Sequence, residues 1–142
     1  MTALRHDGVR HDGIDAMLAD ARSRLDRIDV GAAYREVLDG ALLVDIRPAA
    51  QRAEEGEVHP FLGPLVIERN VLEWRLDPRS DACLARAAHD ARILVLCQEG
   101  YTSSLAADAL RSLGLDATDV VGGFKAWRRA HLPQACPATA ST

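Results

Sequence analysis

One stretch of the chain decides the fold: Ile93-Leu94-Val95-Leu96-Cys97-Gln98-Glu99-Gly100-Tyr101-Thr102, which runs directly into 103–113. Its first four residues are apolar and predict a strand buried on both faces of a sheet. Residues 103–113 place an apolar stripe on one face and stop at Gly114, which predicts an amphipathic helix. The stripe consists of Leu105, Ala106, Ala109, Leu110 and Leu113. A buried strand that passes through a short loop into a helix is typical of α/β proteins.

Working outward, three more short apolar runs predict strands of the same sheet, over 41–46, 65–67 and 117–121. Helices are expected over 32–38, which ends at Asp39-Gly40, and over 81–88, which contains Cys83. Strands that alternate with helices indicate an α/β domain with a parallel sheet.

The remaining segments lie outside this alternation. With 142 residues the chain is long enough for one domain with tails and too short for two ordinary ones. Residues 1–13 are rich in turn formers and are expected to be a flexible arm, and 14–28 have the period of an amphipathic helix that packs on the domain or on a partner. Residues 134–142, with Cys136, are expected to be a disordered tail.

Composition and charge exclude several classes of function. A formal charge of −4 argues against a nucleic-acid partner, because phosphate binding needs clustered cations. Neither a signal peptide nor a membrane span is expected, so we expect a cytoplasmic protein with no membrane partner. Three cysteines without a Cys-x-x-Cys pair suggest no disulfide scaffold and no zinc site, and we expect no metal and no cofactor. Lys125 is the only lysine, and such reliance on arginine favours a bacterial genome of high GC content.

Cys97 is the candidate nucleophile. Functional crevices of open α/β sheets lie beyond the carboxyl ends of the strands, and Cys97 stands at such an end, just before a helix. Loop amides and the helix N-terminus favour a thiolate there, Gly100 permits a positive φ, and Thr102 or Ser103 is expected to cap the helix and offer a hydroxyl. The alternative is an inert cysteine that ends a buried strand. A cysteine phosphatase is disfavoured, because Ser103 stands where its phosphate-binding arginine would be.

Three segments in this order resemble the single-domain rhodanese-like family over roughly 29–133. They are 43–47, which reads Leu-Val-Asp-Ile-Arg; the loop 97–102 with the serine that follows it; and 121–124, Val-Gly-Gly-Phe, with Trp127 and Pro133 beyond. The resemblance implies a three-layer domain, a central parallel sheet with helices on both faces. It also implies sulfur transfer through a persulfide on Cys97. The loop residues expected to bind substrate are Gln98, Glu99, Gly100, Tyr101, Thr102 and Ser103.

Four side chains outside the nucleophile receive roles from their position in the sequence. Asp45 and Arg47 lie at a strand end with opposite charges and are expected to support the site structurally, not to act as acid or base. Trp127 is expected in the core. Glu99 places a carboxylate in the loop, which is expected to make a dianionic donor such as thiosulfate a poor substrate.

The leading hypothesis is a rhodanese-like sulfurtransferase. It would move a sulfane sulfur from a small donor, thiosulfate or a persulfide, through Cys97 to a thiol or cyanide-type acceptor or to a sulfur-accepting protein. A rival is a sulfur-carrier or regulatory binding module with the same fold and no turnover. A third hypothesis is a thiol redox sensor that pairs Cys97 with Cys83 or Cys136.

Overall fold

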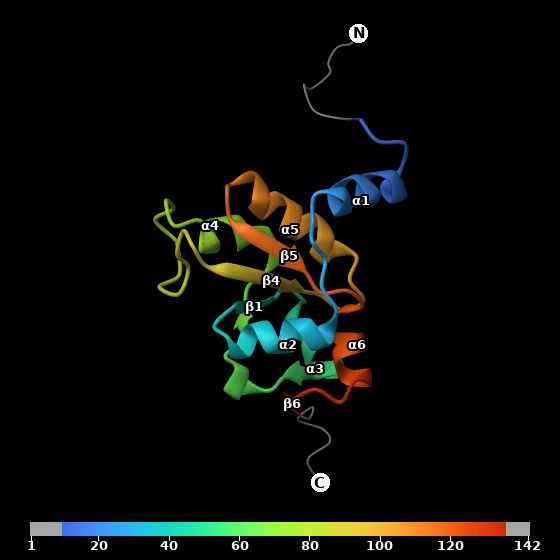
Figure 1. The fold of residues 1–142 in the computed structure, drawn as a ribbon, viewed down its shortest axis with the longest axis vertical. Coiled ribbons are helices and arrows are strands. Elements are labelled where there is room, and N and C mark those ends of the chain that lie inside the picture. Colours follow the sequence, from blue (N-terminus) through green and yellow to red (C-terminus); the bar gives the residue numbers. More distant parts are fainter. Residues whose placement is uncertain (1–9, 136–142) are drawn as a thin grey trace.

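The computed structural model describes residues 10–135 and shows a parallel four-stranded sheet between two layers of helices (Figure 1). The strands lie in the order β3-β1-β4-β5, with bounds Leu65–Val66, Leu42–Asp45, Arg92–Leu96 and Asp116–Asp119. A separate antiparallel pair joins β2, Glu57–Val58, to β6, Gln134–Ala135. The three-layer α/β fold implied by the resemblance is confirmed.

Each face of the sheet is covered by its own helices. One layer contains α1, Ile14–Ser23, α4, Leu72–Leu76, and α5, Thr102–Ser112. The other contains α2, Val30–Leu38, α3, Ala49–Glu55, and α6, Gly123–Arg129. Two short 3-10 turns, Pro60–Leu62 and Arg69–Val71, precede and follow β3 along the chain.

The central strand β4 shows why its sequence is apolar without interruption. Ile93, Val95 and Cys97 face the α4 and α5 layer, whereas Leu94 and Leu96 face the α2 and α6 layer. Alternate side chains of a strand point to opposite faces, so a strand between two layers needs apolar residues at every position. The same alternation sends Cys97 to the α5 side of the sheet.

The helix predicted over 14–28 is shorter than expected. It ends at Ser23, and Ile28 instead pairs with Val120 as a parallel bridge at the outer edge of β5. The amide of Ile28 donates to Asp119 O at 3.3 Å, and the amide of Val121 donates to Ile28 O at 2.8 Å. Pairing with the exposed sheet edge satisfies these backbone groups in place of a further helical turn.

Two other expectations fail locally. Residues 81–88 form successive turns and not a helix, so Cys83 lies in a turn-rich connection. Gln134 and Ala135 form β6, because their backbone pairs with Val58 and Glu57, so the tail prediction is wrong for these two residues. The remainder of the predicted tail, with Cys136, and residues 1–9 of the predicted arm lie outside the described residues.

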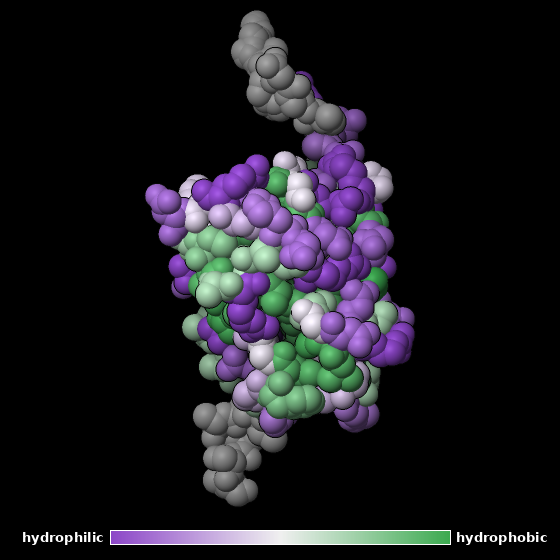
Figure 2. Space-filling view, turned by 60° about the vertical axis from the view of Figure 1, so that its left-hand side comes forward, coloured by the Kyte–Doolittle hydropathy of each residue, from purple (hydrophilic) through white to green (hydrophobic). Residues whose placement is uncertain are grey.

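The surface is polar over α1 and α5 at the top of Figure 2 and more apolar in the lower half of that view. Within residues 10–135, no helix has both the length and the apolar character needed to cross a bilayer.

Candidate active site

The loop 97–101 joins the end of β4 to the start of α5 and curls around the sulfur of Cys97. The side chain of Cys97 is 5% exposed. The amide of Gly100 donates to Sγ at 3.3 Å, and Sγ donates to Ser103 Oγ at 3.1 Å. An amide aimed at the sulfur and a hydroxyl beside it are groups that stabilise a thiolate or a sulfur attached to it.

Gly100 is required at the turn of this loop. Its φ is +88°, and a Cβ added there would lie 2.9 Å from the amide nitrogen of Gly122. A side chain would therefore meet backbone strain and a steric clash together.

The start of α6 packs against the other side of the loop. The amides of Phe124 and Lys125 donate to the carbonyls of Cys97 and Gln98 at 2.8 and 2.9 Å. A Cβ on Gly123 would overlap the carbonyl oxygen of Cys97 and lie 2.7 Å from the carbonyl carbon of Gln98. This close approach is the physical reason for a glycine at position 123.

Asp45 and Arg47 lie under the loop at the end of β1, both 2% exposed. Arg47 Nη2 donates to Asp45 Oδ2 at 2.7 Å and to the carbonyl of Gly56 at 2.9 Å, and its Nη1 is 3.4 Å from Gln98 Oε1. The guanidinium also stacks 4.3 Å from the ring centre of Phe124. These contacts join β1, α3, α6 and the loop, consistent with a supporting role.

Glu99 is paired, contrary to the premise of the sequence argument about donors. Its carboxylate lies 3.2 Å from Lys125 Nζ, with both side chains about half exposed. The Glu99 carboxylate, which was expected to repel an anionic donor, is therefore not an unpaired charge. The sequence did not reveal the pair because α6 lies 26 residues further along the chain.

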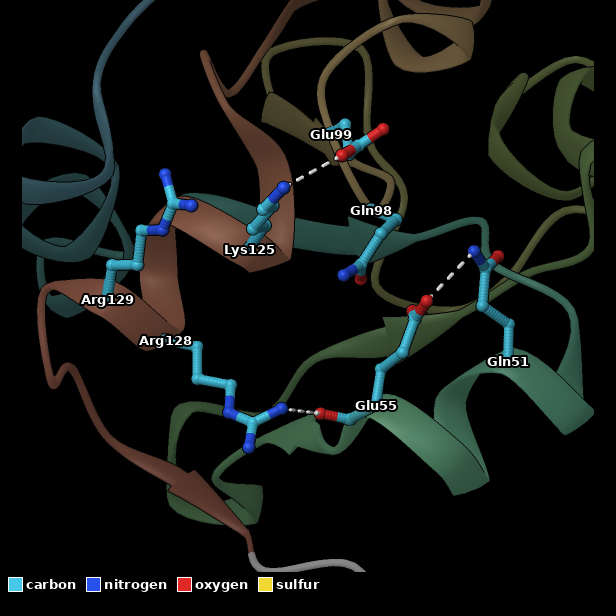
Figure 3. A pocket seen from close by; sticks show the side chains of 7 residues that line it. All are labelled: Gln51, Glu55, Gln98, Glu99, Lys125, Arg128 and Arg129. Atoms are coloured by element: carbon cyan, nitrogen blue, oxygen red, sulfur yellow. Dashed lines mark hydrogen bonds and ion pairs between the residues drawn. The ribbon is translucent and has the colours of Figure 1, made fainter.

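A cavity of about 630 Å³ adjoins the outer side of the loop (Figure 3). Its lining combines loop residues Gln98 and Glu99 with Gln51 and Glu55 of α3 and with Lys125, Arg128 and Arg129 of α6. Arg128 donates to the backbone carbonyl of Glu55 at 3.2 Å, whereas the guanidinium of Arg129 makes no hydrogen bond to any residue within 10–135. Three cations against two carboxylates suit a small anion better than a cation.

Among the remaining predicted loop residues, the expected cap of α5 is absent. Tyr101 is 59% exposed, and Arg22 lies 5.7 Å from its ring centre. Neither Thr102 nor Ser103 caps α5, whose N-cap residue is Tyr101 without a side-chain cap bond. Ser103 is fully buried, and its hydroxyl is directed instead to Cys97 and to Asp119.

Trp127 is fully buried, as predicted, and its indole N–H donates to the carbonyl of Pro133 at 2.9 Å. Trp74 is 59% exposed. In the part of the chain that the structure describes, no three His, Cys, Asp or Glu side chains gather as a metal site would require.

Several residues of the site were not identified from the sequence. Asp119, at the end of β5, is fully buried and accepts from both Ser103 and Ser104. Arg22 and Arg27, from the N-terminal segment, both donate to the carbonyl of Gly100. An acidic residue inside the apolar run 117–121 was the available signal for Asp119, whereas nothing local marks the two arginines.

Comparison with known proteins places most of the chain in one family. Residues 29–130 match the model described as a rhodanese-like domain. A thiosulfate sulfurtransferase of Vibrio cholerae, GlpE, is 30% identical over 107 residues, which cover 68% of this chain and 96% of the relative. An adenylyltransferase and sulfurtransferase of Zea mays, MOCS3-1, is 33% identical over 100 residues, but the chain spans only 20% of that longer protein.

Solved structures extend the likeness toward the N-terminus. A Rhodopseudomonas palustris protein, described as of unknown function and a possible tyrosine phosphatase, superposes with a TM-score of 0.77 at 28% identity over 94% of this chain and all of its own. A polysulfide-sulfur transferase homodimer from Wolinella succinogenes superposes with a TM-score of 0.73 over 90% of both chains. At 19% identity, the second likeness concerns the fold alone.

Proposed function

Because the chain belongs to the rhodanese-like domain family, we propose that it is a sulfurtransferase in which Cys97 carries the transferred sulfur. Family membership and relatives named as sulfurtransferases support sulfur transfer in general. The observation that carries the assignment to Cys97 is the arrangement around its sulfur, where the Gly100 amide and the Ser103 hydroxyl both lie within hydrogen-bond distance.

The proposed reaction has two halves. The Cys97 thiolate attacks the outer sulfur of the donor, an S–S bond forms on Cys97, and the donor's own bond to that sulfur breaks, releasing sulfite from thiosulfate or a thiolate from a persulfide. An acceptor thiolate or cyanide then attacks the outer sulfur of the persulfide and releases Cys97 as a thiolate. The Gly100 amide already directed at the sulfur stabilises its negative charge without reorganisation.

We propose a small anionic donor as the first choice. The cavity beside the loop is lined by Lys125, Arg128 and Arg129, and Glu99 is compensated by its ion pair with Lys125. Attraction to these cations favours approach of an anion such as thiosulfate to the loop. The acceptor is a low-molecular-weight thiol, a cyanide-type nucleophile or the thiol of a sulfur-accepting protein.

A phosphatase activity is less well supported. Ser103 occupies the position where a phosphatase loop has its arginine. Arg22 and Arg27 approach the loop, but both direct donors to the carbonyl of Gly100 and away from a phosphate cradle. A bidentate guanidinium contact to a bound phosphate therefore has no donor within this loop.

The test is the mass of the intact protein after incubation with donor alone. Loading should add about 32 Da, one sulfur, and a thiol acceptor should remove it with release of a new persulfide. Cys97→Ser should abolish the added mass, whereas Cys83→Ser, which changes the other cysteine within residues 10–135, should keep it. Sulfur on another cysteine would contradict the assignment. Loading without turnover in the presence of acceptors would favour the carrier or regulatory module.

A further inference from the structure

Two arginines tie the N-terminal segment to the loop that holds Cys97. Arg22 of α1 donates from Nη2 to the carbonyl of Gly100 at 2.6 Å, and Arg27, in the extended stretch after α1, donates to the same oxygen at 3.1 Å. Both residues precede the 29–130 match. A part of the chain outside the family domain thus contacts the loop directly.

Arg27 also neutralises a buried carboxylate. Its Nε and Nη2 lie 3.0 and 3.1 Å from the two oxygens of Asp119, which is fully buried. Ser104 donates to Asp119 Oδ2 at 2.7 Å. Burying a carboxylate costs free energy unless the group is paired and hydrogen-bonded, and Arg27 supplies a bidentate partner.

Ser103 connects this carboxylate to the sulfur. Its hydroxyl accepts from Cys97 Sγ at 3.1 Å and donates to Asp119 Oδ2 at 3.3 Å. A hydroxyl has a single proton to donate. When the thiol has lost its proton to solvent, the Ser103 hydroxyl is free to turn toward the sulfur, because Asp119 retains its bonds from Ser104 and Arg27.

We propose that Arg27 and Asp119 are positioning residues that together set how readily Cys97 ionises, acting through Ser103. The proposal rests on the sulfur chemistry assigned to Cys97 above. Asp119 is two hydrogen bonds from the sulfur, so its negative charge opposes a thiolate, and the positive charge of Arg27 offsets it. The N-terminal segment is then part of the active site and not only an addition to the fold.

The test leaves the other charged side chains around the loop unchanged. Arg47 and Asp45 are bound to each other under Gln98, and Lys125 is paired with Glu99 on the α6 side. Glu68 and Arg69 follow β3, and Arg69 is paired with Glu73 at 2.8 Å. Three further cations lie near the loop. Arg22 donates from Nε to Ser104 Oγ at 3.0 Å, and Arg128 and Arg129 line the cavity on the outer side.

The experiment measures the alkylation rate of Cys97 against pH, in a Cys83→Ser and Cys136→Ser background. Arg27→Gln should raise the pH midpoint, because Asp119 loses its counter-charge. Asp119→Asn should lower the midpoint, because Arg27 is left unbalanced. A unit charge about 6 Å away at an effective dielectric of about 20 corresponds to a shift of roughly one to two pH units. The double variant should return close to the unchanged protein.

Opposite signs separate this proposal from a merely structural role, in which both single variants loosen the loop and shift the midpoint in the same direction. Shifts of the same sign, or no shift, would overturn it. Arg24→Gln is the matched control: Arg24 belongs to the same segment but binds Asp108 at 2.7 Å, and its loss should leave the midpoint unchanged. A shift there equal to that of Arg27→Gln would also overturn the proposal.

Folding of each variant is checked by circular dichroism. If Arg27→Gln does not fold, Asp119→Asn decides alone, and an unchanged or raised midpoint refutes the proposal. If Asp119→Asn does not fold, the two Arg27 variants decide. Arg27→Lys should keep the midpoint close to that of the unchanged protein, whereas Arg27→Gln should raise it. Equal shifts in these two variants refute the proposal. Alkylation needs no sulfur transfer, so absent sulfur loading refutes the proposed function and leaves this measurement interpretable.

Discussion

Replacing Gly123 with alanine should displace the active-site loop from α6. The φ of Gly123 is +60°, and its Cβ would lie 2.7 Å from both the carbonyl carbon and the oxygen of Gln98. Carbon atoms prefer a separation of roughly 3.5 Å or more, so the loop and α6 must move apart by about 0.8 Å. The amides of Phe124 and Lys125 hold two loop carbonyls at this contact, and their hydrogen bonds would lengthen.

The expected cost has two parts that a control separates. A non-glycine residue in the left-handed region costs roughly 1–2 kcal/mol. Gly114 has a φ of +84° with no atom within 4 Å of its added Cβ, so Gly114→Ala should show this cost alone. Overpacking typically costs a further 1–3 kcal/mol, which places Gly123→Ala at about 2–5 kcal/mol.

Urea denaturation measures the free energy of unfolding of both variants, and mass spectrometry measures sulfur loading. Gly123→Ala should lose more stability than Gly114→Ala and should load sulfur at least about tenfold more slowly, because a displacement approaching 1 Å misaligns the Gly100 amide with the sulfur. Gly114→Ala should load at the rate of the unchanged protein. Equal stability losses with normal loading in both variants would refute the claim that the contact between α6 and the loop maintains the site.

Four further substitutions test the charges around the loop and α1. Glu99→Gln should raise kcat/KM for thiosulfate by about twofold to tenfold more than it raises kcat/KM for an uncharged donor, and Lys125→Gln should lower kcat/KM for thiosulfate. Both effects should shrink as the salt concentration rises. If neither substitution changes kcat/KM for thiosulfate, the cavity is not the route of an anion. Arg47→Met should cost about 3–5 kcal/mol in urea denaturation because it leaves a buried carboxylate unpaired, and a loss below 1 kcal/mol would contradict that account. Hydrogen bonds from Arg24 and His11 hold the pKa of Asp20 below its ordinary value of 3.8, so its stabilising contribution is present above pH 3.8 and is lost as pH falls through the lower pKa of the folded state. Asp20→Asn should therefore lose less stability than the unchanged protein on acidification below pH 3.8, and identical acid profiles would count against this pair.

Much of the fold follows from local sequence. The apolar runs that form β1, β4 and β5 lie within a few residues of their predicted bounds, because a strand covered on both faces must be apolar at each position. The helix after Cys97 was also predictable from its stripe and from Gly114. The candidate loop was found for the same reason, since a strand end, a permissive glycine and a helix start are adjacent in the chain.

Contacts between distant segments were decided only by the tertiary structure. Helix α1 ends at Ser23 because the backbone of Ile28 pairs with the edge of β5, and helical periodicity carries no information about that edge. Glu99 is an unopposed carboxylate in the sequence and half of an ion pair in the fold. Arg27 meets Asp119 across 92 residues, and that pair lies two hydrogen bonds from Cys97. The sequence by itself determined which cysteine stands at a strand end; the packing of the N-terminal segment on the sheet decided which charges surround its sulfur, because electrostatic interactions depend on distance in space and not on separation along the chain.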